Sequence, residues 1–151
     1  MEALFEYRIP VWHPIAVHLP PALLLVSAGA AAGWIAWGGA AWRRTLAALL
    51  ALSALGTAFA YFTGEAMARR SEGVPIVEEL VNLHAQLALY TLVGTGLALA
   101  GAIGALVWSR RSGCNAPRWV RFAVGFIVLA AVALVLATAH LGGTMTWGVP
   151  E

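Results

Sequence analysis

The side chains with the most chemical potential in this sequence are its four histidines, His13, His18, His84 and His140. Imidazole is a ligand for heme iron, zinc and copper. The four residues are far apart in the chain, yet each lies near the end of a long apolar stretch. Because polar side chains of ligand type are costly near hydrocarbon, they tend to mark function there. We therefore expect a shared metal or heme site, provided that the fold brings these side chains together.

The composition indicates the class of protein that must position them. Of 151 residues, 61% are hydrophobic and only 11% are charged, whereas about a quarter of the residues in a soluble domain are charged. The length fits one domain, residues 1–151. The single cysteine, Cys114, is too few for a disulfide or a cysteine metal site. A net charge of +2 gives no indication of a nucleic-acid partner.

Four apolar stretches are long enough to cross a bilayer, which takes about 20 residues of helix. They cover about 15–37, 46–62, 80–107 and 119–141. Each must be helical, because backbone groups in lipid have no water to bond. Regular helix in the first stretch is expected to begin near Pro20, with His18 just ahead of it. The predicted fold is an all-α, integral membrane, antiparallel four-helix bundle.

The charges between these stretches predict their orientation. One side of the predicted bundle carries six arginines and no acid: Arg43, Arg44, Arg110, Arg111, Arg118 and Arg121. All seven acidic residues are on the opposite side. Short basic loops stay in the cytoplasm. We therefore predict a bacterial inner-membrane protein with both termini, and all four histidines, on the outer, periplasmic side.

Histidines at the same level of a membrane bundle could form two kinds of site, one for heme and one for a bare metal ion. A b-type heme, one or two copies, needs imidazoles that face each other across its plane, and helices of a bundle can supply them. Arg69 and Arg70 are candidates for binding the heme carboxylates. A heme-free copper, zinc or iron centre would use three or four of the histidines. Taken singly, each histidine could instead cap a helix or bond to water, and the two arginines could be an ordinary solvated pair.

Sequence alone also favours particular roles within the set. His84 has leucines at 80, 83 and 87 and an alanine at 88 around it, so it is the most enclosed candidate. We expect it to be an axial ligand, paired with His18 or His140. His13 precedes the first predicted helix, so its expected role is to orient a ligand or to close the site.

Several short motifs resemble a known family. His13-Pro14-Ile15-Ala16-Val17-His18-Leu19-Pro20 is similar to the opening His-Pro-x-x-Val-His-Phe-Pro of small bacterial membrane proteins called domain of unknown function 2231. Thr63-Gly64-Glu65-Ala66, the lone His84, and Ala139-His140-Leu141-Gly142-Gly143 also resemble that family. Leu19 replaces its usual phenylalanine, and the histidine that often follows the terminal glycines is missing. The resemblance implies a four-helix membrane domain in which the four histidines matter, and it implies no settled activity.

These observations favour a membrane-anchored b-type heme protein that transfers electrons at the outer face of the membrane. It would be a subunit of a redox or respiratory complex rather than a stand-alone enzyme. The expected partners are a periplasmic redox protein, other membrane subunits or quinol. The alternatives are a heme-free protein that binds copper, zinc or iron, and a non-catalytic subunit whose histidines are structural.

Overall fold

The computed structural model describes residues 12–69 and 75–148, and this part of the chain is all-α. It contains one short helix, α2 (His13–Ala16), and four long ones: α3 (Leu19–Trp37), α4 (Ala40–Ala68), α5 (Pro75–Ser112) and α6 (Arg118–Trp147). The four long elements are long and apolar enough to cross a membrane, the first of them together with α2. The predicted fold class is confirmed to that extent.

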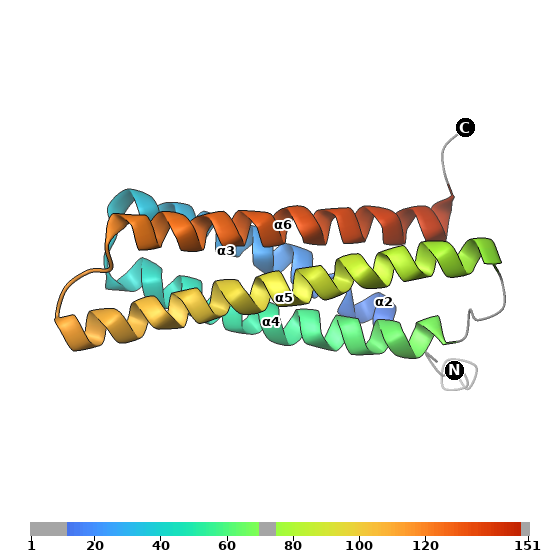
Figure 1. The fold of residues 1–151 in the computed structure, drawn as a ribbon, viewed down its shortest axis with the longest axis horizontal. Helices are drawn as coiled ribbons and strands as arrows, with labels where there is room; N and C mark the ends of the chain where they lie inside the picture. Colours follow the sequence, from blue (N-terminus) through green and yellow to red (C-terminus); the bar gives the residue numbers. More distant parts are fainter. Residues whose placement is uncertain (1–11, 70–74, 149–151) are drawn as a thin grey trace, which may run out of the picture.

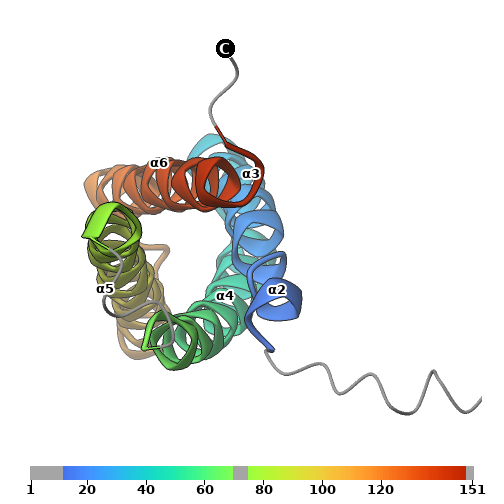
Figure 2. The ribbon, with the colours of Figure 1, turned by 90° about the vertical axis from the view of Figure 1, so that its right-hand side faces the viewer.

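The long helices form an antiparallel bundle with a square cross-section (Figures 1 and 2). Each packs against two neighbours, in the cyclic order α3, α4, α5, α6, and α2 packs beside α4. The turn between α3 and α4 consists of Gly38 and Gly39, whose φ angles of 68° and 86° are readily accessible only to glycine. We call the end with this turn and the α5–α6 connection the arginine end, and the opposite end, where α2 begins and α6 stops, the histidine end.

The first span is divided where its prolines predict. α2 has Pro14 in its first turn, and α3 begins at Leu19 with Pro20 in its first turn. Proline is favoured in a first turn because its missing N–H would have no partner there. The other helices extend beyond the predicted spans at both ends, into segments that contain polar residues. With 38 residues, α5 is about 57 Å long, against about 30 Å of hydrocarbon.

The interior is a narrow core of small and aliphatic residues. On α5 the buried positions recur every three or four residues, at Thr91, Thr95, Ala98, Ala102 and Ala105. Small residues of this kind let membrane helices approach closely. Large apolar side chains point outward instead, which is the arrangement expected of helices that face lipid.

This core does not reach the histidine end. The last buried residue toward that end is Thr57 on α4, Thr91 on α5 and Val135 on α6. Beyond these positions the described side chains of the three helices are half-buried or exposed, although each helix continues for several turns. The buried core of α4, α5 and α6 therefore covers the middle and the arginine end of the bundle, whereas near the histidines Ala16 of α2 is buried.

Candidate metal centre

The structure brings two of the four histidines together. The ring centroids of His13 and His84 lie 6.4 Å apart, and the ring planes are at 90° to each other. His13 opens α2, and His84 lies in α5. Both are half-buried, just beyond the point where the packed core ends. The pair lies close to Thr63 of α4, which is about 30 Å along that helix from Arg43, roughly the thickness of the hydrocarbon.

His84 faces the interior because of its position along α5. Counting back from the buried Thr91 by a turn at a time gives Ala88 and then His84, so these residues share the inner stripe of the helix. The Nδ1 atom of His84 is buried and has no hydrogen-bond partner among the described residues. Gly142 of α6 lies directly against the ring, since a Cβ added there would lie 3.1 Å from Cε1 of His84.

His13 is held by α4. Its Nδ1 lies 3.0 Å from the carbonyl oxygen of Ala60 and 3.3 Å from Oγ1 of Thr63. Because a carbonyl can only accept, the contact with Ala60 assigns the proton to Nδ1 and leaves Nε2 with a free lone pair, which could bind a metal. Gly64 lies against the ring, and a Cβ added there would lie 2.9 Å from Cε1 of His13.

The other two histidines lie outside this pair. His18 and His140 are both exposed. On α6 the residues that face the interior near this end are Thr138 and Gly142, and His140 is two positions from each, so it points to the opposite side of the helix. His18 lies in the bend between α2 and α3, five residues after His13 and therefore on a different face. The structure thus places His84 beside His13 rather than beside His18 or His140.

The remaining candidates are less enclosed. Arg69 is exposed at the end of α4, and Arg70 lies outside the described residues. Glu65 is also exposed and accepts a hydrogen bond of 2.9 Å from the Tyr61 hydroxyl. Within residues 12–69 and 75–148, no group of three or more histidine, cysteine or acidic side chains could hold a metal ion. The described part of the chain offers a two-histidine site.

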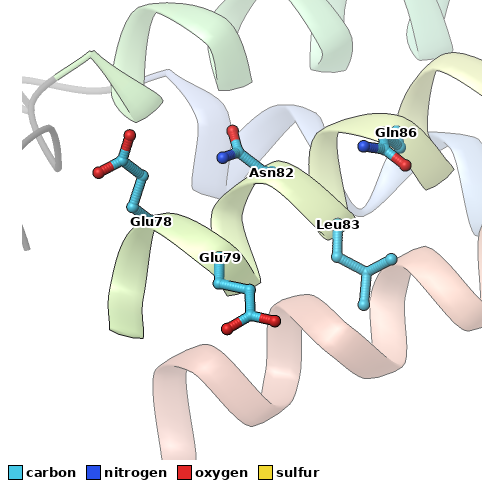
Figure 3. Close-up of a pocket in the computed structure, with 5 residues that line it drawn as sticks. All are labelled: Glu78, Glu79, Asn82, Leu83 and Gln86. Atoms are coloured by element: carbon cyan, nitrogen blue, oxygen red, sulfur yellow. The ribbon is translucent and has the colours of Figure 1, made fainter. Parts of the chain in front are cut away.

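A shallow hollow on α5 is separate from the pair. It is lined by Glu78, Glu79, Asn82, Leu83 and Gln86, all from this one helix. Figure 3 shows Glu78, Asn82 and Gln86 along one side of the helix, with Glu79 and Leu83 along the other. All five are exposed, so this surface contributes nothing to the histidine site.

Three residues beside the two histidine rings are not predicted as site residues by the sequence: Thr63, Gly64 and Gly142. They belong to the short motifs that resemble a known family. In the fold, these motifs meet at one place, because Gly64 contacts His13 and Gly142 contacts His84. A glycine beside a motif residue at a helix end was the available signal, since it permits such close contact.

Comparison with known proteins adds no assignment: no family model, no curated protein and no solved structure matches this chain. The resemblance to domain of unknown function 2231 stays a prediction.

Proposed function

We propose that His13 and His84 would hold one b-type heme, and that the protein is a membrane-anchored electron-transfer subunit. The separation of the two rings carries this proposal. Two imidazoles that both bind one ion, with metal–nitrogen bonds of about 2 Å, would place their ring centroids about 6–6.5 Å apart. The observed separation is 6.4 Å. Such a heme would supply a one-electron redox couple.

The packing around the pair supports this choice. A macrocycle needs to lie between helices, and beyond Thr57, Thr91 and Val135 the described side chains of α4, α5 and α6 are half-buried or exposed rather than part of the packed core. The orphaned Nδ1 of His84 and the free Nε2 of His13 are consistent with a ligand between the rings. Two ligands on the described helices correspond to a single heme.

The distribution of charge supports a location on the outer side. The arginine end carries the basic loops that stay in the cytoplasm, so the histidine end would face the periplasm of a bacterial inner membrane. Electrons would then pass between quinol or a membrane subunit and a periplasmic redox protein. Each of these partners would approach the heme at the histidine end of the bundle.

A heme-free copper site is the second candidate, and one observation favours it. A Cβ added at Gly64 or Gly142 would crowd the His13 or His84 ring, so the two rings have close neighbours, which suits a single small ion between them. Copper(I) accepts few ligands, whereas a zinc site usually takes four. Zinc and heme-free iron are less well supported, because the described residues contain no group of three suitable side chains.

A visible spectrum of the purified protein, with and without dithionite, tests the proposal. We expect the absorption of a low-spin heme with two histidine ligands, which His84→Ala should abolish while the protein still inserts into membranes. His140→Ala is the matched control and should keep the full spectrum, since His140 is exposed and outside the pair. A full heme spectrum in His84→Ala would remove this residue from the site. Bound copper with no heme in any preparation would favour the second candidate.

A further inference from the structure

A buried positive charge lies at the arginine end, far from the histidines. Arg43, in the first turn of α4, is only 7% exposed. Its Nε and Nη1 atoms are buried and donate to no acceptor among the described residues. A guanidinium does not lose its proton in a protein, so it is charged wherever it lies. A buried charge without a partner is strongly unfavourable.

Two further donors at this end also lack partners. Ser109 of α5 is 9% exposed, and its hydroxyl forms no hydrogen bond within the described chain. This is unusual here, because the hydroxyls of Ser27, Ser53 and Ser112 each donate to the carbonyl one turn earlier. Arg121 of α6 donates from Nη1 to the Trp34 carbonyl at 3.3 Å, while its buried Nε has no partner.

These three residues occupy corresponding positions on their helices. Arg43 is one turn before the buried Ala47, Ser109 is one turn after the buried Ala105, and Arg121 is one turn before the buried Gly125. Each therefore continues the inner stripe of its helix at the arginine end. Ala116, in the α5–α6 connection, is 2% exposed and belongs to the same core.

No acidic residue of the described chain lies near these donors. The acidic residues of the described segments, Glu65, Glu78 and Glu79, are all at the histidine end. The first turns of α4 and α6 also lie at the arginine end, and neither has a side-chain cap, so their free N–H groups and positive dipole ends add to the attraction. A tetrahedral oxyanion with several acceptors matches such a set of donors, and arginine binds phosphate with two parallel hydrogen bonds.

We propose that Arg43, Ser109 and Arg121 form a binding site for a phosphate group at the arginine end of the bundle. The surroundings favour the headgroup of an anionic phospholipid over free phosphate. Trp37 and Trp42 are stacked, with centroids 5.5 Å apart, and Trp119 is exposed at the same end. Tryptophans gather at the level of lipid headgroups. The site is independent of the proposed heme.

Thermal unfolding in a neutral detergent tests this site, with two added probes. One probe is phosphatidylglycerol against phosphatidylcholine, and the other is inorganic phosphate against chloride at equal ionic strength. We expect phosphatidylglycerol to raise Tm of the wild type. In Arg43→Gln the apparent affinity for phosphatidylglycerol should fall at least about tenfold, because a charge-assisted pair of hydrogen bonds is lost. Arg44→Gln removes an exposed neighbour of the same charge, and it should change the affinity for phosphatidylglycerol less than about twofold.

Two serine variants give a second comparison. Ser109→Ala should lower the apparent affinity for phosphatidylglycerol by about threefold, as expected for the loss of one neutral hydrogen bond, while Ser112→Ala should not lower it. A response to inorganic phosphate as well, with the same dependence on Arg43, would identify a free phosphate ligand. Equal responses in Arg43→Gln and Arg44→Gln, or no response to either probe, would overturn the site. If Arg43→Gln does not fold, Ser109→Ala against Ser112→Ala decides the result.

Discussion

At the scale of single residues, two glycines determine where the histidine rings can lie. A Cβ added at Gly64 would lie 2.9 Å from Cε1 of His13, and one added at Gly142 would lie 3.1 Å from Cε1 of His84, so each ring would have to shift. Ring position is what a metal centre depends on, because a ligand nitrogen must stay within a few tenths of an ångström of its bonding distance. The glycines are therefore as important to the proposed centre as the histidines.

Gly142→Ala should displace the His84 ring, because the new methyl group would lie 3.1 Å from Cε1. We expect a large fall in heme or copper content, or a low-spin heme converted to high spin, with the protein still inserted in the membrane. Visible absorption and electron paramagnetic resonance would measure either change.

Gly143→Ala is the control for this substitution. Gly143 is the next residue of the same helix, and a Cβ added there meets nothing within 4 Å. Its metal content and spectrum should match those of the wild type. If Gly142→Ala and Gly143→Ala lost equal amounts of heme or copper, the loss would come from any substitution in this part of α6. The contact between Gly142 and His84 would then have no specific role.

At the scale of elements, the junction between α3 and α4 depends on one close contact. A Cβ at Gly33 would lie 2.6 Å from Cε3 of Trp42, whose ring is stacked on Trp37. A rigid aromatic ring yields less easily than a flexible chain. If a side chain is added at Gly33, either the Trp42 ring must turn and lose its stacking on Trp37 or the two helices must separate.

Gly33→Ala should destabilise the bundle by about 1–3 kcal/mol, the usual cost of overpacking. Gly29→Ala is the matched control, because a Cβ there meets nothing within 4 Å. Alanine favours helix over glycine by about 1 kcal/mol, so this variant should be as stable as the wild type or slightly more so. Unfolding in mixed micelles would measure both, and equal stability of the two variants would contradict the importance of the Gly33 contact.

The helices were predictable from sequence, and the histidine pairing was not. Four long apolar stretches permit only helices in a membrane, so fold class and helix number followed from composition. The sequence predicts that His84 pairs with His18 or His140, and that His13 orients a ligand or closes the site. In the structure the His13 ring lies beside His84, because α2 packs beside α4. His140 lies toward the same end, but its helical phase turns it outward.

The sequence also does not show which arginines of the arginine end turn inward. Its six arginines form one basic group that predicts the orientation of the chain. In the structure, Arg43 is buried, whereas the adjacent Arg44 is exposed. Which of two neighbouring arginines turns inward depends on the rotation of α4 about its axis, and that rotation is set by packing against α3 and α5.

At the scale of the whole molecule, charge divides the two ends and predicts the topology. Cys114, in the α5–α6 connection, is exposed at the arginine end. Because basic loops remain in the cytoplasm, a membrane-impermeant thiol reagent should label Cys114 only after the inner membrane is opened.

A relocated cysteine provides the control for topology. Thr146→Cys, made together with Cys114→Ala, places a thiol near the end of α6, where residue 146 is exposed. It should react with the same reagent once the outer membrane is made permeable, without opening of the inner membrane. Reaction of Cys114 under these milder conditions would contradict the predicted orientation.

The position of all the histidines at one end has a consequence for energy conversion. Moving one elementary charge across a whole membrane at 100 mV involves about 2.3 kcal/mol. An electron that enters and leaves the proposed heme at the histidine end would cross only a small part of that voltage. The reduction potential of this centre should therefore be nearly insensitive to the membrane potential. On this proposal the protein would relay reducing equivalents without itself contributing to the proton-motive force.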